Sequence, residues 1–273
     1  MKRVYIDAQL QVEWLLHLRT RANENPRYKT CRGKLKPNTI NNYWRAVRLF
    51  YKWAYRKGKI AQDPTAGIEG PKATRPYVAT FKEDHVAALL QLCPPNTRWG
   101  ARDRAIIITL LRTGVRLSEL CSMEVSELNL DQRCAKVRGK AKRGQGQGPR
   151  ERVVYLDGEV RKTILDWLML RTTNGTDTLW TTHTGKPLTP NAVELVMRRI
   201  KEKVGADDVR ISAHTFRHTF AVNLLRHGKD IRFVQACLGH DDIESTQIYV
   251  RTLTQEDALE WRKNVDPFKG WKL

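Results

Sequence analysis

Hydrophobic positions recur at helical spacing in the N-terminal quarter of the chain. Between residues 9 and 18 they form one stripe, made by Leu10, Trp14 and Leu18. The basic segment 19–36 then predicts a loop. A longer helix is predicted from Pro37 onward, because proline is favoured in the first helical turn. Its apolar face consists of Ile40, Tyr43, Val47, Phe50 and Ala54.

The pattern becomes mixed after residue 79. Helices still predominate, but short runs of alternating polar and apolar residues predict strands as well. From Val160 onward the chain returns to helical patterns separated by Gly and Pro. The elements predicted before that point are a helix from a capping box at Thr80–Glu83 through Leu92, a buried helix over 102–112 that stops at Gly114, and two strands at Arg133–Arg138 and Arg152–Leu156.

A break separates these two patterns. Gly70–Pro76 contains two prolines and two basic residues, which cannot continue a helix. We therefore expect a helical domain at 1–72, a linker at 73–78 and a larger domain at 79–273. The expected fold class is mainly α with a small antiparallel β-sheet. A chain of 273 residues is long enough for two such domains, each with its own core.

Positive charge narrows the possible partners. The formal net charge is +20, and residues 1–75 hold 17 Lys+Arg against 5 Asp+Glu. Such an excess implies an anionic polymer or surface as partner. The helix predicted from Pro37 also carries a polar stripe, which is either a solvated face or a DNA contact, and the surrounding charge favours DNA. The stripe consists of Asn41, Arg45, Arg48 and Lys52.

Membrane and metal partners are disfavoured. No apolar run approaches the roughly 20 residues that a spanning helix needs, and the first residues lack the apolar stretch of a signal peptide. The five cysteines are an odd, scattered set without a closely spaced pair, which fits reduced thiols and argues against a zinc site. We expect a cytoplasmic, nucleoid-associated protein with no membrane partner and no metal.

Two arginines, two histidines and a tyrosine supply the candidate chemistry. Arg116 lies upstream, His214 and Arg217 lie three residues apart on a predicted helix, and His240 is followed nine residues later by Tyr249. Guanidinium groups match phosphate oxygens, and tyrosine can act as an oxygen nucleophile. Tyr249 alone would be a packing residue in most proteins. Together these residues suggest covalent handling of a phosphodiester.

Three segments carry a family resemblance. TGVRLSEL at 113–120, HTFRHTFA at 214–221 and LGHDDIESTQIYV at 238–250 are similar to the signature segments of the tyrosine recombinases, the phage-integrase and Xer-like enzymes. The resemblance extends from about residue 8 to 255. It implies a two-domain DNA clamp, in which 1–72 is the helical, SAM-like core-binding domain and 79–273 is the α+β catalytic domain.

The resemblance also implies residue roles. Arginines would clamp the scissile phosphate, and the tyrosine would attack it to leave a 3′-phosphotyrosine bond. The segment Gly139–Lys140–Ala141 opens a longer turn than is common in the family, so Lys142 competes with Lys140. The implied roles are Arg116 and Arg217 as the phosphate clamp, Tyr249 as nucleophile, His214 and Lys140 in proton transfer, His240 in orienting the phosphate and Glu119 in supporting the arginines.

The function implied is site-specific recombination of double-stranded DNA, for integration, excision or resolution, by a homotetramer on two recombination sites. Accessory DNA-bending or directionality proteins are possible partners. No cofactor is expected, because exchanging one ester for another conserves the bond energy. The alternatives are type IB topoisomerase-like strand relaxation and a non-catalytic DNA-binding regulator. The tail 251–273 either folds back on its own domain or is donated to a neighbouring subunit, and its apolar end favours donation.

Overall fold

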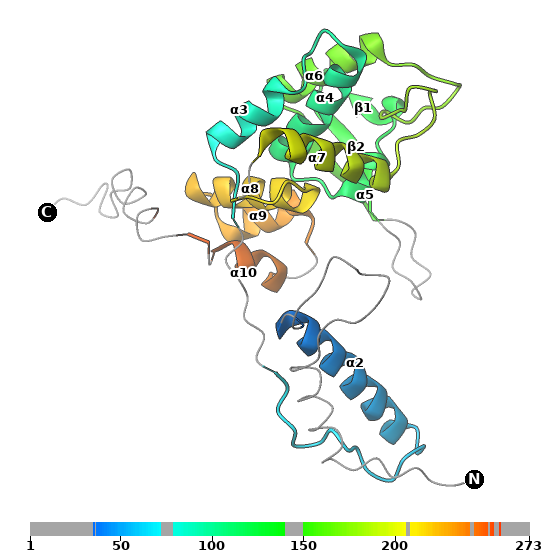
Figure 1. Cartoon of the computed structure of the whole chain (residues 1–273), viewed down its shortest axis with the longest axis vertical. Helices are drawn as coiled ribbons and strands as arrows, with labels where there is room; N and C mark the ends of the chain where they lie inside the picture. The colour runs from blue at the N-terminus through cyan, green and yellow to red at the C-terminus, as the bar shows by residue number, and fades with distance from the viewer. Residues whose placement is uncertain are drawn as a thin grey trace, which may run out of the picture. The chain divides into compact units, whose positions relative to one another are not determined.

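The computed structural model describes residues 35, 37–71, 79–139, 150–205, 208–240, 243–250, 252–253 and 257. The chain divides into two compact units, Met1–Pro76 and Tyr77–Leu273, which are described separately (Figure 1). Several features predicted from the sequence lie wholly or mostly outside the described residues: the helix at 9–18, the loop at 19–36, the linker at 73–78, the turn that opens at Gly139 and the tail 251–273.

In the N-terminal unit, helix α2 (Pro37–Arg56) begins at the predicted proline. Its buried face contains Ile40 and Trp44, which pack with Leu35 and Ile68 in a small core. The segment after the helix folds back along it, since a Cβ added at Gly70 would lie 2.3 Å from Trp44 Nε1. The predicted helix from Pro37 onward is confirmed, but its predicted apolar face is only partly right, because Trp44 is buried while Tyr43 and Phe50 are exposed.

Helix α4 (Arg98–Thr113) lies at the centre of the C-terminal unit. It packs against α6 (Gly158–Leu170) and α8 (Ala213–Arg226). Thr97 caps its N-terminus by accepting a hydrogen bond from the Gly100 N–H. The helix ends where Gly114 takes a left-handed conformation, with φ 61°. The predicted buried helix and its stop at Gly114 are confirmed.

Helix α3 (Glu83–Gln91) packs against α7 (Pro190–Val204) on another side of this core. The predicted capping box at Thr80–Glu83 is wrong. The cap is Lys82, whose backbone N–H donates to Nδ1 of His85 at 3.2 Å. Thr80 lies two residues before this cap, too early to satisfy the first free N–H groups of α3.

A three-stranded antiparallel sheet completes the C-terminal unit, in the order β1–β2–β3. The strands are β1 (Leu128–Asn129), β2 (Cys134–Arg138) and β3 (Glu151–Tyr155). A 3₁₀ turn, η2 (Val125–Glu127), precedes β1. The sequence pattern predicted neither η2 nor β1. The mainly α fold with a small antiparallel sheet is confirmed. None of the helices that the structure describes is long and apolar enough to cross a membrane.

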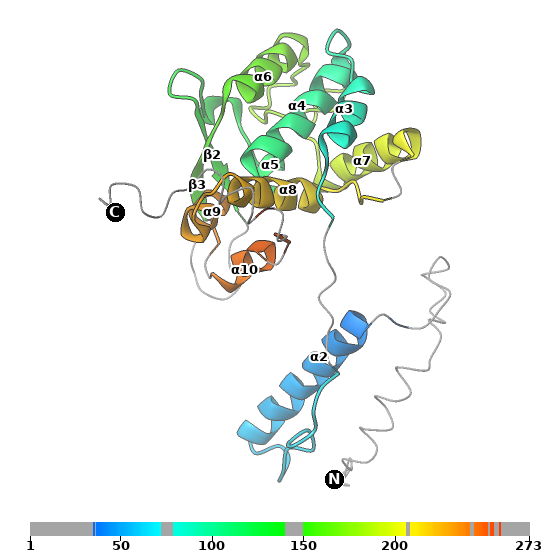
Figure 2. The ribbon, with the colours of Figure 1, turned by 90° about the vertical axis from the view of Figure 1, so that its left-hand side faces the viewer.

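Three helices at the C-terminal end form a second core. Helices α8, α9 (Ile231–Leu238) and α10 (Glu244–Val250) contact one another, and α9 lies near the β2–β3 sheet in Figure 2. This cluster contains Val222, Leu225, Val234, Leu238 and Tyr249. The helices that carry Arg217 and Tyr249 therefore belong to one packed body.

Candidate active site

Arg217 is buried at the centre of the site. Its side chain lies on α8 and the residue is only 4% exposed. Nη1 donates to the carbonyl oxygen of Gly114 at 2.6 Å, and Nη2 donates to that of Leu238 at 2.8 Å. Gly114 caps the C-terminus of α4, and Leu238 is the last residue of α9. Both acceptors are thus at the partially negative ends of helices, which favour a buried cation.

Burial, followed by repulsion from Arg116, lowers the pKa of Arg217 to about 10. Tyr249 and Glu119 act in the opposite direction. At neutral pH the guanidinium therefore stays charged. A charged, buried and hydrogen-bonded arginine is a preorganised site for an anion.

Tyr249 lies on α10 and is 2% exposed. Burial raises the pKa of its hydroxyl, while the charge and hydrogen bond of Arg217 and the charge of Arg116 lower it; the net pKa stays above its usual value. The tyrosine ring stacks on His240, with ring centres 6.1 Å apart, and lies 5.0 Å from the ring of His218. The predicted nucleophile is therefore in contact with two imidazoles and an arginine.

His240 is positioned by the turn that ends α9. Gly239 allows this turn by adopting φ 63°. The backbone N–H of His240 then donates to the carbonyl oxygen of Gln235 at 3.2 Å. Its Nδ1 lies 2.8 Å from the hydroxyl of the buried Thr246, on α10. The orientation of His240 is thus fixed by the same helix that carries Tyr249.

Arg116 and Glu119 form a pair at the start of α5 (Leu117–Cys121). Arg116 is the N-cap, and its backbone N–H donates to Glu119 Oε2 at 2.8 Å. Its Nη1 donates to Glu119 Oε1 at 2.9 Å, and its Nη2 donates to the Gly239 carbonyl at 3.3 Å. Glu119 is buried, whereas the Arg116 side chain is 42% exposed. Arg116 therefore keeps one side open to a ligand.

Arg152 belongs to this cluster and was missed by the sequence predictions. It lies on β3, and its guanidinium donates to both oxygens of Glu119 and to the Cys237 carbonyl. A signal was present in the sequence, because the alternation along β3 places Arg152 on the same face as the buried Val154. An arginine on the inward face of a strand needs a buried acceptor, and Glu119 is that acceptor.

His214 lies in the first turn of α8 and is exposed. Partial burial of its ring lowers its pKa, and the positive charges of Arg217 and Arg210 lower it further. A neutral imidazole at pH 7 can accept a proton. The structure thus brings His214 into the electrostatic field of Arg217, as the spacing on one helix predicted.

The remaining predicted residues fall into two groups. Lys140 and its competitor Lys142 lie outside the described residues. The polar stripe belongs to α2, in the other unit: Asn41 is half-buried, and the three basic side chains are exposed. The three are Arg45, Arg48 and Lys52.

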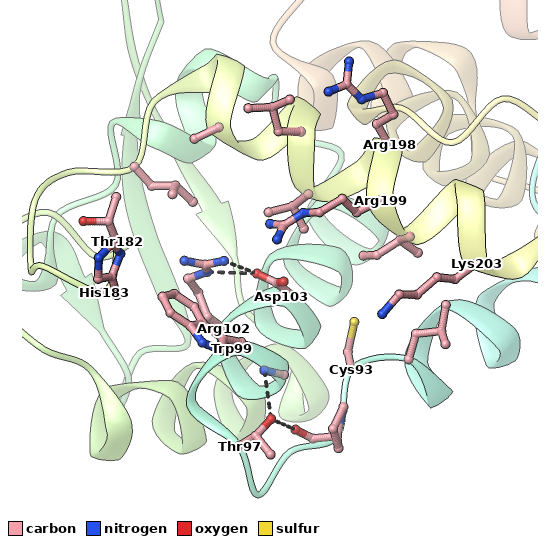
Figure 3. A pocket seen from close by; sticks show the side chains of 18 of the residues that line it. Cys93, Thr97, Trp99, Arg102, Asp103, Thr182, His183, Arg198, Arg199 and Lys203 are labelled. Atoms are coloured by element: carbon pink, nitrogen blue, oxygen red, sulfur yellow. Dashed lines mark hydrogen bonds and ion pairs between the residues drawn. The ribbon is translucent and has the colours of Figure 1, made fainter.

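A separate cavity of about 930 Å³ lies between α3, α4, α7 and the turn before α7. Figure 3 shows Arg102 beside Trp99 and paired with Asp103 at its wall. None of the candidate catalytic residues that the structure describes lines this cavity. Within the described part of the chain, no group of three or more His, Cys, Asp or Glu residues is placed to hold a metal ion.

Comparisons with known proteins identify the family of this chain. The model of the phage integrase family matches residues 79–256, which is more than half of the chain. The tyrosine recombinase XerD of Pseudomonas aeruginosa is 35% identical over 225 residues, covering 78% of this chain and 71% of that protein. The tyrosine recombinase XerC of Xylella fastidiosa is 32% identical over 218 residues, covering 80% of this chain and 71% of that protein.

Solved structures show the same fold. An integrase of the transposon Tn1549, in complex with transposon right end DNA, gives a TM-score of 0.73 at 20% identity, covering 97% of this chain and 87% of that one. The site-specific recombinase XerH, bound to a palindromic difH substrate, gives a TM-score of 0.72 at 21% identity, covering 97% of this chain and 73% of that one. The chain belongs to the phage integrase family and is a site-specific tyrosine recombinase.

Proposed function

We propose that this recombinase cleaves and rejoins DNA through a covalent bond between Tyr249 and a 3′-phosphate. The observation that carries the proposal is the buried contact of Tyr249 with Arg217, beside His240 and in the field of Arg116. A phosphate placed against Tyr249 would meet these two arginines. Their positive charges would stabilise the extra negative charge of a five-coordinate transition state.

In the proposed step the phenolic oxygen of Tyr249 attacks phosphorus while the bond from phosphorus to the 5′-oxygen breaks. His214, whose pKa is held below its usual value, accepts the tyrosine proton. Lys140, or Lys142 in its place, donates a proton to the departing 5′-oxygen, which leaves as a 5′-hydroxyl. One ester replaces another, so the energy of the broken bond is kept. His240 orients the phosphate, and Glu119 holds Arg116.

The low exposure of Tyr249 has a mechanistic consequence. A duplex phosphate cannot reach a tyrosine that is 2% exposed unless α10 or its neighbours move. We therefore propose that DNA binding and exposure of the nucleophile are coupled. Asp257, beyond this helix, still pairs with Arg226 of α8 at 3.0 Å. Donation of the tail to a neighbouring subunit would thus begin after Asp257.

The proposed assembly is a homotetramer on two double-stranded DNA sites, in which each active protomer cuts one strand. Accessory DNA-bending or directionality proteins would set the outcome. The two related proteins named above are called tyrosine recombinases, and two of the solved structures hold DNA. These likenesses support DNA recombination sites as the substrate. A topoisomerase-like or regulatory role has no observation in its favour.

Covalent capture tests the proposal. Nicked suicide duplexes with randomised flanks are incubated with the wild type, Tyr249→Phe and Tyr155→Phe, and DNA that stays attached after denaturation is sequenced. Tyr155 is 61% exposed on β3 and serves as the matched control. We expect adducts with the wild type and Tyr155→Phe, none with Tyr249→Phe, and an inverted repeat among the captured sites. Adducts that persist in Tyr249→Phe would refute the nucleophile assignment.

A further inference from the structure

The guanidinium of Arg152 makes hydrogen bonds to two separate elements of this site. Its side chain is 13% exposed. Nη2 donates to Glu119 Oε2 at 2.8 Å, Nε donates to Glu119 Oε1 at 3.4 Å, and Nη1 donates to the Cys237 carbonyl at 2.7 Å. One side chain on β3 thus joins α5 to the last turn of α9.

Arg116 contrasts with Arg152. The two guanidiniums share the Glu119 carboxylate, and they bind carbonyls two residues apart, at Cys237 and Gly239. The Arg116 side chain is about three times as exposed, 42% against 13%. Arg116 can therefore reach a phosphate, whereas every guanidinium nitrogen of Arg152 already donates a hydrogen bond to Glu119 or to Cys237.

The turn before His240 rests directly on Arg152. A Cβ added at Gly239 would lie 2.7 Å from the Arg152 Cδ and 3.1 Å from its Nε. The backbone at Gly239 can pass over the arginine only because this residue has no side chain. Any displacement of Arg152 is transmitted to Gly239, and so to both Arg116 and His240.

Arg152 also helps to keep the pKa of Glu119 low. Burial alone raises the pKa of this carboxyl, but the hydrogen bond and charge of Arg152, followed by the hydrogen bonds of Arg116, hold it below its usual value. Arg217 is the third cation within electrostatic reach. Without Arg152, Arg116 would be the one hydrogen-bonded cation that the described residues offer to the buried carboxylate, which would draw its guanidinium away from the position it needs beside the phosphate.

We infer that Arg152 is a positioning residue for DNA cleavage, which holds Glu119 and the turn 237–240 so that Arg116 and His240 face the phosphate. This inference rests on the proposed function. It assigns to Arg152 no contact with DNA. The reaction therefore depends on Arg152 for its rate, and DNA affinity does not.

The test uses Arg152→Met, Arg152→Lys and the control Lys136→Met. Lys136 also lies in the sheet and also pairs with a carboxylate, Glu151, but this pair is exposed. Single-turnover cleavage of a suicide duplex and DNA affinity are measured from pH 5 to pH 8, per folded molecule. For Arg152→Met we expect cleavage about 10- to 100-fold slower, DNA affinity within about threefold, and Lys136→Met close to the wild type.

The pH profiles separate positioning from loss of structure. In Arg152→Met the pKa of Glu119 rises, so cleavage should fall more steeply than in the wild type as the pH drops. Arg152→Lys keeps the charge but cannot bind Glu119 and Cys237 together. It should be slower than the wild type with an unchanged pH profile. If Arg152→Met does not fold, Arg152→Lys still tests the inference through its cleavage rate and its DNA affinity.

Three results would overturn the inference. The first is cleavage at the wild-type rate in both Arg152 variants. The second is a fall in DNA affinity that matches the fall in cleavage rate. The third is a dependence of the cleavage rate on pH in Arg152→Met that runs parallel to that of the wild type. Failure of the proposed function gives a different result, because the wild type itself would then form no adduct that depends on Tyr249.

Discussion

Burial of a cation such as Arg217 destabilises the folded state unless the charged group and the polar groups around it form hydrogen bonds. Here two helix-terminal carbonyls and Tyr249 accept hydrogen bonds from it, so the guanidinium is held in place before DNA binds. The two carbonyl contacts can persist when α10 moves to expose Tyr249, as the proposed function requires. Preorganisation of this kind avoids the energetic cost of reorienting dipoles during the reaction.

The ionisation of His214 is testable at the same scale. Its pKa is lowered by partial burial and by Arg217 and Arg210, so in the folded, DNA-free protein it should titrate below the 6.5 of an unperturbed histidine. Because the folded state binds this proton more weakly than the unfolded chain does, His214 should cost stability as the pH falls below 6.5. NMR titration of the imidazole signals, assigned with His214→Gln, measures the midpoint. A midpoint at or above 6.5 contradicts the prediction.

Single residues also show how far the sequence could be interpreted. Arg116, Glu119, His240 and Tyr249 stand in recognisable motifs, and the fold gathers them. Arg152 has no motif of its own, and its partner Glu119 is 33 residues away in the chain. The pattern along a strand can indicate that a side chain points inward, but it cannot identify the acceptor that side chain will meet.

Helix ends, more than helix interiors, build this site at the scale of elements. Helices α4, α7 and α9 all end in a left-handed glycine. The carbonyl of Gly114, after α4, accepts a hydrogen bond from Arg217, and that of Gly239, after α9, accepts one from Arg116. Gly205, after α7, takes no part in the candidate site. This difference gives a matched pair of substitutions.

Gly114→Ala should destabilise the protein more than Gly205→Ala. The two glycines have φ 61° and 64°, so alanine costs about 1 kcal/mol of left-handed strain at either. At Gly114 the new Cβ would also lie 2.4 Å from Phe220 Cδ1, whereas at Gly205 nothing lies within 4 Å. The overpacking adds about 1 to 3 kcal/mol. Denaturant unfolding monitored by circular dichroism measures both, and equal losses would contradict the steric argument.

The elements themselves were largely predictable. Helices α2 and α4 and the two longer strands follow the apolar pattern and the Pro and Gly signals closely. The cap of α3 was wrong because Lys82 takes the position through its backbone, which no side-chain preference reveals. Strand β1 was missed because two residues are too few for an alternating pattern, and its pairing with β2 is set by tertiary contacts.

Charge is the property that acts on the whole molecule. Of the net charge of +20, residues 1–75 carry +12. Each phosphate neutralised by the protein releases counterions, and log affinity falls with log salt by about 0.9 per phosphate. The full chain should therefore bind a duplex target with a steep salt dependence. Measurement in the Tyr249→Phe background keeps covalent adducts from distorting the affinity.

The stripe on α2 should account for part of that slope. Replacing Arg45, Arg48 and Lys52 by glutamine should reduce the slope of log affinity against log salt by about 2 to 3. The control replaces three other exposed lysines, which removes the same total charge from elements without a candidate catalytic residue. It should leave the slope nearly unchanged. Equal slopes for the two triple variants would show that net charge alone, and not the α2 stripe, holds the DNA. The control residues are Lys162, Lys186 and Lys201.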